Sequence, residues 1–141
     1  MILLAQTAMS FLGTPYIYGG NTRYGMDCGG LVMEILKSAG AAPPYDHNSQ
    51  MLYDYFEHRG EWNRYGIGTL VFYGKNVTAI EHVALMIDDR NKRIIEAHGN
   101  RSVTDPIEAL KLGYEVRIRH IDYRKDRVAV IRPYYREIGS I

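Results

Sequence analysis

Apolar positions in the first half of the chain recur at helical spacing and predict three helices. These cover residues 2–12, 28–40 and 49–60. Asp27 stands where a capping residue belongs before the second helix, and Gly40 followed by Pro43 ends that helix. The stretch between the first two helices, residues 13–25, contains four glycines and three tyrosines and is predicted to be an ordered loop with an aromatic surface.

From residue 69 onward the pattern changes to short segments rich in β-branched and aromatic residues. Five strands are predicted, at residues 69–73, 82–88, 93–98, 115–121 and 127–132. The polar turn at 88–92 joins two of them as a hairpin, and a short helix follows Thr104, with Pro106 in its first turn and Gly113 at its end. Helices that precede a run of strands are typical of an α+β domain, here with the helices packed on a mostly antiparallel five- to six-stranded sheet.

The composition favours one compact domain over residues 1–141, because a chain of this length with 46% hydrophobic residues can bury most of its surface. With 17 basic and 16 acidic side chains, the chain has no charge excess that would favour nucleic acid. No apolar run approaches the ~20 residues that cross a bilayer, and no signal peptide is predicted. These features favour a virion- or tail-associated or cytoplasmic protein, or a domain excised from a secreted protein.

The chain has a single cysteine, Cys28, so an internal disulfide and a paired-cysteine zinc site are both excluded. Cys28 falls in the first turn of the helix predicted after Asp27, where the helix dipole and free N–H groups stabilise a thiolate. Gly29 and Gly30 leave space beside the sulfur, and the early N–H groups can form an oxyanion hole. The pattern indicates a nucleophile for acyl transfer. The alternative is that Cys28 is a small buried residue on the apolar stripe of this helix.

A general base must come from another part of the fold, and His82 opens a predicted strand whose alternation turns it away from the core face. On the next strand Glu96 and His98 share one face, so either side chain can orient His82. Each residue also has a simpler interpretation. His82 can be a solvated strand-end residue, Glu96 the partner of a surface arginine, and His98 the cap of the turn at Gly99.

Three segments together resemble the NlpC-type cell-wall cysteine peptidases: Leu-Gly-Thr-Pro-Tyr-Ile-Tyr-Gly-Gly at 12–20, Met-Asp-Cys-Gly-Gly-Leu-Val at 26–32 and His-Val-Ala-Leu-Met-Ile at 82–87. Their order and spacing agree with the family over roughly residues 5–100. The resemblance implies a papain-like fold and hydrolysis of an amide in the stem peptides of peptidoglycan, typically the bond between D-glutamate and a diamino acid. It also implies that Cys28 is the nucleophile and His82 the base.

The resemblance implies further roles for individual residues. Tyr16 would line the site near the oxyanion position, and Asp27 would help hold the free amine of the substrate. Gly29 stands where the family usually has a serine, so a hydroxyl that contacts substrate or caps the helix is absent. The third catalytic position of the family falls on Glu96 rather than on a histidine, and His98, two residues on along the same strand face, shares or replaces that role.

The expected reaction is attack by the Cys28 thiolate on an amide carbonyl, with His82 moving the protons. It requires no metal and no cofactor. The expected partners are the stem peptides of peptidoglycan, and the favoured setting is a phage tail, a lysin or a larger wall-lytic assembly.

Three other functions remain open from the residues alone. One is a non-catalytic cell-wall-binding module that uses the tyrosine-rich loop and the basic stretch from Arg117 to Arg136. Another is a catalytic metal site built from His82, Glu96 and His98. The third keeps the cysteine chemistry in an amidohydrolase or acyltransferase that acts on a different amide.

Overall fold

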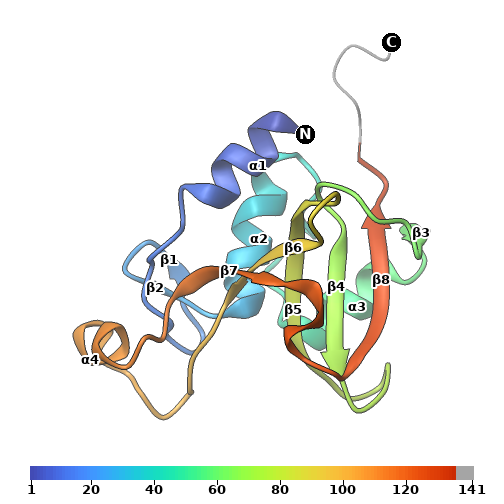
Figure 1. Cartoon of the computed structure of the whole chain (residues 1–141). Helices are drawn as coiled ribbons and strands as arrows, with labels where there is room; N and C mark the ends of the chain where they lie inside the picture. The colour runs from blue at the N-terminus through green and yellow to red at the C-terminus, as the bar shows by residue number, and fades with distance from the viewer. Residues whose placement is uncertain (136–141) are drawn as a thin grey trace.

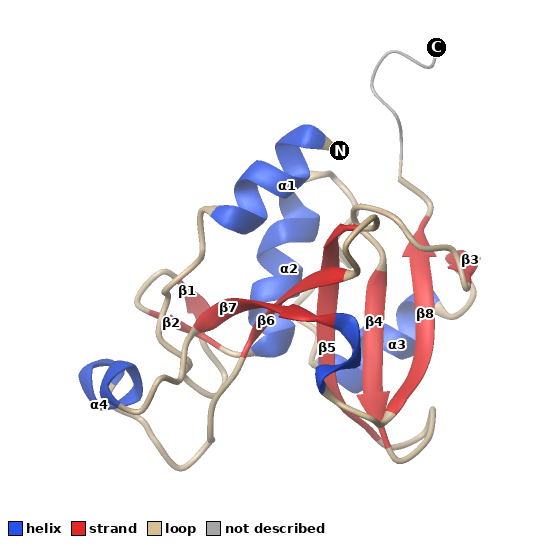
Figure 2. Cartoon of the chain, viewed as in Figure 1, coloured by secondary structure: helices blue, strands red, loops and turns tan. Residues whose placement is uncertain are grey.

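The computed structural model describes residues 1–135, in which helices and an antiparallel sheet form two layers (Figure 1). Helices α2 (Cys28–Ser38) and α3 (Ser49–Phe56) lie against one face of the sheet, and α1 (Ile2–Met9) packs on α2. A short helix, α4 (Pro106–Lys111), lies away from the sheet, as Figure 2 shows. Of the described helices, none is both long enough and apolar enough to cross a membrane.

The sheet has six strands in the order β3-β8-β4-β5-β6-β7, and every neighbouring pair is antiparallel. A 3-10 turn, η1 (Ile121–Tyr123), connects the seventh strand to the eighth. The strands are β3 (Gly60–Trp62), β4 (Leu70–Gly74), β5 (Ile80–Asp88), β6 (Arg93–Ala97), β7 (Val116–His120) and β8 (Arg127–Pro133). This mixed architecture is the predicted α+β fold.

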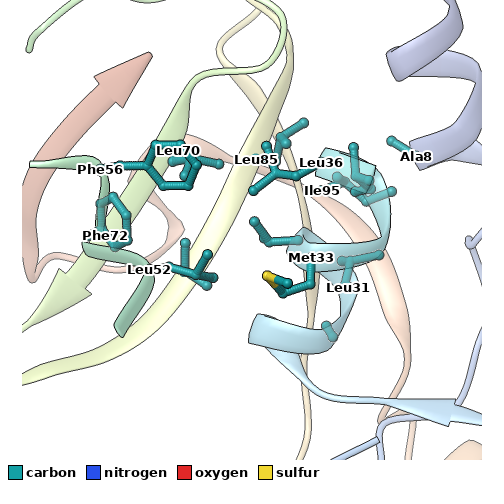
Figure 3. Close-up of a cluster of buried hydrophobic side chains, with 14 of the residues drawn as sticks. Ala8, Leu31, Met33, Leu36, Leu52, Phe56, Leu70, Phe72, Leu85 and Ile95 are labelled. Carbon is teal, nitrogen blue, oxygen red and sulfur yellow. The ribbon is translucent and has the colours of Figure 1, made fainter. Parts of the chain in front are cut away.

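Two buried clusters cover the two faces of the sheet. On the helix side, Figure 3 shows Leu36 of α2 beside Leu85 of β5 and Ile95 of β6, and all three are completely buried. The smaller cluster on the other face comprises Val71, Tyr73, Ala84, Met86, Ile94, Ile121 and Val130. Burial of each large apolar side chain contributes about 1.5–3 kcal/mol. The core therefore fixes α2 on the sheet, and with it the position of Cys28.

The predicted elements are confirmed where the sequence signals are local. All five predicted strands occur within two residues of the expected bounds, and the second helix begins at Cys28. Asp105 caps α4, which has Pro106 at its first position, and Gly113 follows it with φ of 75°. The hairpin between β5 and β6 also forms at the expected turn.

Three predictions of local structure were wrong. The first helix ends at Met9, and the predicted loop at 13–25 contains a small hairpin of β1 (Asn21–Thr22) and β2 (Gly25–Met26). Gly60 does not end α3 but opens β3, where it pairs with β8. A Cβ at Gly60 would lie 2.7 Å from the carbonyl oxygen of Arg132, so the glycine is required by the close approach of two strands rather than by a helix end.

Candidate active site

The N-terminus of α2 is held by the side chain of Asp27. Its Oδ1 accepts a hydrogen bond from the N–H of Gly30 at 2.8 Å, and its Oδ2 accepts one from the N–H of Gly19 at 2.8 Å. The first bond caps the helix, as predicted, and contributes about 1 kcal/mol. Cys28, the first residue of α2, therefore sits at the positive end of the helix dipole, beside N–H groups that have no partner within the helix.

Two glycines let other chain segments approach the first turn of α2. A Cβ at Gly30 would overlap the carbonyl oxygen of Gly20. A Cβ at Gly29 would lie 3.0 Å from the carbonyl oxygen of His47 and 3.2 Å from the Cα of Asn48. A side chain at position 29 would require this backbone to move by a few tenths of an ångström, a smaller shift than a side chain at Gly30 would need.

We expect Gly30→Ala to destabilise the protein by about 1–3 kcal/mol and to reduce activity, because the new methyl group displaces the start of α2 and with it Cys28. Gly29→Ala is the matched control in the same turn. Its looser contacts, 3.0 Å and longer, and the better helix propensity of alanine should keep it within about 1 kcal/mol of the wild type. Urea unfolding measures both variants. Equal stability of the two would contradict the close approach at Gly30.

His82 and Glu96 lie next to each other on neighbouring strands, β5 and β6. Nε2 of His82 is 3.5 Å from Oε2 of Glu96, and both side chains are buried. The other carboxylate oxygen, Oε1, lies 3.5 Å from Nε of Arg119 and 3.6 Å from Nε of Arg117, both on β7. Glu96 and Arg117 are direct cross-strand partners, so the register of β6 and β7 sets this arrangement. Two arginines thus compensate the buried carboxylate.

The protonation of His82 depends on Cys28 and Glu96 together. Burial lowers the pKa of His82, but its interactions with Cys28 and Glu96 outweigh burial and raise the pKa to about 9. The imidazole is therefore protonated at neutral pH. Because Nε2 faces Glu96, Nδ1 is the nitrogen left for the sulfur.

His98 lies just beyond β6, and its ring packs edge-on against Tyr114 with centroids 5.8 Å apart. Burial, and then the positive charge of Arg117, lower the pKa of His98, so its imidazole is neutral at neutral pH. Of the two predicted partners of His82, Glu96 is the one at ion-pair distance. His98 instead contributes to the wall of an adjoining pocket.

Two pockets of about 340 Å³ each flank Cys28. The first, which we call the His82 pocket, is lined by Tyr16, Cys28, Glu81, His82, Ala97, His98, Gly99, Tyr123 and Arg124. The second, the Arg101 pocket, is lined by Tyr16, Tyr18, Asp27, Cys28, Gly29, Asn48, Ser49, Gln50, Ile80, Glu81 and Arg101. A peptide that lies across Cys28 can therefore place one half in each pocket.

Tyr16 stands between these two pockets. A backbone bridge with Met26 holds it beside the start of α2, and its ring packs on Gly99, where a Cβ would overlap the ring. Burial, followed by the negative charges of Cys28 and Asp27, raises the pKa of Tyr16 to about 12. The phenol therefore stays protonated and can donate a hydrogen bond to an oxygen that gains negative charge.

Residues 13–121 match the model of the NlpC/P60 family, over a span that includes Cys28, His82 and Glu96. The chain belongs to the NlpC/P60 family. The family resemblance inferred from the three sequence segments is thereby confirmed. Solved NlpC/P60 structures share the fold, as a Bacillus cereus family protein illustrates with a TM-score of 0.71 and 24% identity over 96% of this chain and 40% of that one. The NlpC/P60 domain of the peptidoglycan hydrolase SagA has a TM-score of 0.67 and 18% identity, over 92% of this chain and 96% of that one.

Curated relatives of this NlpC/P60 chain are peptidases. A γ-D-glutamyl-L-lysine dipeptidyl-peptidase of Bacillus cereus is 32% identical over 90 residues, which cover 62% of this chain and 26% of that protein. The enzyme of the same name from Bacillus subtilis is 40% identical over 47 residues, 33% of this chain and 16% of that protein. This chain thus matches about a quarter or less of the length of these relatives.

Several residues that line the NlpC/P60 site were not predicted from the sequence. Tyr18 and Arg101 come from loops, where no periodicity indicates which way a side chain points. Gly99 was predicted only as a turn position, although the ring of Tyr16 is what requires it. For Glu81 a signal existed, because it directly precedes His82 in the sequence.

The described part of this NlpC/P60 chain bears on two of the alternative functions, the metal site and the binding module. Within residues 1–135 no three His, Cys, Asp or Glu side chains are grouped as a metal site. The basic stretch is not an open cationic surface either, since Arg117 and Arg119 face the buried carboxylate of β6, and Arg124 and Arg127 pair with aspartates. Arg136, its last member, lies outside the described residues.

Proposed function

We propose that this NlpC/P60 domain is a cysteine peptidase that cleaves the bond between γ-linked D-glutamate and a diamino acid in peptidoglycan stem peptides. The observation that carries the proposal is Cys28 at the start of α2 beside a protonated His82, whose Nε2 lies 3.5 Å from Glu96. Cys28 is the nucleophile, His82 the general acid and base, and Glu96 the residue that orients His82. The names of the Bacillus relatives support the substrate class.

Acylation begins when the Cys28 thiolate attacks the carbonyl carbon of the scissile amide. The carbonyl oxygen becomes negatively charged, and the free N–H groups at the start of α2 and the Tyr16 hydroxyl can stabilise it. The carbon–nitrogen bond then breaks as His82 transfers its proton to the leaving amine. The acyl group remains on Cys28 as a thioester.

Deacylation uses the now neutral His82 as a base. It takes a proton from water, the resulting hydroxide attacks the thioester carbonyl, and the carbon–sulfur bond breaks. The products are a carboxylic acid and the regenerated pair of Cys28 thiolate and protonated His82. Glu96 stabilises the charged form of His82 at each return to this state.

Substrate binding follows from the two pockets. Asp27 lines the Arg101 pocket and carries a negative charge with which it can bind a free substrate amine. Both of its oxygens already accept backbone N–H groups, which fixes the orientation of the carboxylate. Tyr16 contacts both halves of the substrate, and Gly29 contributes backbone only to the pocket wall.

The test is mass spectrometry of the products after incubation with L-Ala-γ-D-Glu-L-Lys, the corresponding diaminopimelate peptide and an N-acetylated version. Release of L-Ala-γ-D-Glu is the expected result, and the N-acetylated peptide should react more slowly because it lacks the amine for Asp27. Protein alkylated at Cys28 is the matched control, since the chain has no other cysteine.

Two outcomes would contradict the proposal in different ways. RipD of Mycobacterium tuberculosis is described as a non-catalytic NlpC/p60 domain adapted to peptidoglycan binding, and this chain covers 95% of it with a TM-score of 0.66. Binding of muropeptides without cleavage would indicate that kind of module here. Cleavage of other amides but not of stem peptides would indicate a different amidohydrolase or acyltransferase. The phage or lysin setting stays a prediction.

A further inference from the structure

Arg101 lines the Arg101 pocket from the loop that follows β6. Its guanidinium lies over the ring of Tyr18, 4.7 Å from the centroid. Across residues 1–135 the structure gives Arg101 no ion pair with an acidic side chain, in contrast to Arg124 and Arg127 in the same protein. The guanidinium is therefore positioned by an aromatic ring while its hydrogen-bond donors remain available for a ligand.

The positive charge of Arg101 acts on Tyr16, which stands between the two pockets. Burial raises the pKa of Tyr16, and the positive charge of Arg101 partly offsets that effect. Two carboxylates, those of Asp27 and Glu81, line the same pocket. The pocket thus carries charges of both signs around Cys28, a pattern that suits a ligand with a free amine and a free carboxylate.

The position of His82 decides which half of a substrate enters this pocket. His82 gives its proton to the leaving amine, so the leaving group must lie on the side of the His82 pocket. The Arg101 pocket includes Cys28 but not His82. It therefore holds the acyl half, the part that becomes the thioester.

We propose that Arg101 is a specificity-determining residue that binds a free carboxylate on the acyl half of the substrate, next to the scissile carbonyl. The inference rests on the proposed function, because a γ-linked D-glutamyl group carries such a carboxylate at its α-carbon. A planar guanidinium matches a carboxylate through paired hydrogen bonds, and a neutral carboxamide lacks both the charge and the second acceptor. The domain therefore prefers stems with free D-glutamate over stems amidated to D-isoglutamine.

The experiment compares kcat/KM for L-Ala-γ-D-Glu-L-Lys and for the same peptide with the α-carboxylate converted to a carboxamide. The wild type should favour the carboxylate peptide by about tenfold to a hundredfold, the range for a charge-assisted hydrogen bond. Arg101→Gln should bring this ratio close to one, and Arg101→Lys should give an intermediate ratio. Added salt should reduce the preference, because the arginine is exposed.

Arg90→Gln is the matched control, since it removes one exposed positive charge at the far end of β5 from His82. It should leave the ratio unchanged. Equal cleavage of both peptides by the wild type, or an unchanged preference in Arg101→Gln, would overturn the role of Arg101 while the proposed function stands.

A binding measurement keeps the inference testable without turnover. In the Cys28→Ala background, calorimetry with L-Ala-γ-D-Glu and L-Ala-D-isoglutamine should show tighter binding of the first, and Arg101→Gln should remove the difference. Cleavage of neither peptide by the wild type would contradict the proposed function, and this binding difference would then decide the role of Arg101 independently. Equal affinities for the two dipeptides would overturn it.

Discussion

Cys28→Ala is expected to abolish hydrolysis of stem peptides, with a loss of about 10,000-fold or more in kcat, while the protein stays folded. The loss follows because alanine has no nucleophile that can form the thioester. The fold should persist because Cys28 is only partly buried at the edge of the core, whereas the Asp27 cap and the fully buried residues Leu31, Val32, Ile35 and Leu36 hold α2 in place. Alanine is also a favourable residue in a helix.

The measurement is the initial rate of peptide cleavage, followed by mass spectrometry, beside a thermal unfolding curve for each protein. Cys28→Ser serves as the second variant, since it keeps the size of the side chain but replaces the thiol with a hydroxyl of much higher pKa. Both variants should unfold at close to the wild-type temperature. Retention of most of the activity in either one would refute Cys28 as the nucleophile.

Glu96→Gln is expected to lower both activity and stability. It removes a completely buried carboxylate that lies 3.5 Å from His82 and 3.5–3.6 Å from two arginines. Breaking a buried ion pair by removing one partner costs about 3–5 kcal/mol. Because Arg117 and Arg119 are 29% and 35% exposed and can turn towards water, we expect the lower part of that range or slightly less, about 2–3 kcal/mol.

The pH dependence of activity and stability in Glu96→Gln tests whether the loss comes from the lowered pKa of His82. The folded-state pKa of His82, about 9, lies above the ordinary value of 6.5. The stability that this shift provides is therefore fully present below pH 6.5 and is lost as the pH rises through about 9. Without the Glu96 carboxylate the pKa of His82 falls, so the basic limb of the activity profile moves to lower pH and the stability changes less between pH 6.5 and 9.

The matched control is His98→Gln, which changes the other candidate for the third catalytic position. Its ring packs against Tyr114, so this variant should keep the basic limb of the activity profile near that of the wild type. NMR titration of His82 and kcat/KM as a function of pH measure both variants. A shifted basic limb in His98→Gln with no shift in Glu96→Gln would assign the orienting role to His98 instead.

Local signals in the sequence predicted α2 and the position of Cys28 at its start. A capping aspartate, an apolar stripe and a terminating glycine are all close together in the chain, and the helix begins at the expected Cys28. The strands of the sheet were also predictable, because alternation and β-branched residues act over a few positions. By contrast, β3 has three residues and is defined by its pairing with β8, some seventy residues later, which no local pattern indicates.

The relation of His82 to its partners was harder to predict for the same reason. Glu96 and His98 share a strand face, and the choice between them depends on the arginines of β7, whose position is set by the register of another strand pair. From the sequence, the pairing of Glu96 with an arginine was expected as an alternative to its contact with His82. In the structure one carboxylate oxygen faces His82 and the other faces the arginines, so both occur together.

The strand order makes the folding of β4 depend on the last strand of the chain, β8. β8 lies between β3 and β4, so β4 keeps one unpaired edge until residues 127–133 dock beside it. All five residues of β4 are buried in the finished sheet, and an apolar strand with a free edge readily associates with other chains. Since this pairing joins segments far apart in sequence, it forms slowly. We therefore expect chains interrupted before residue 127 to aggregate, and docking of β8 to be a late step in folding.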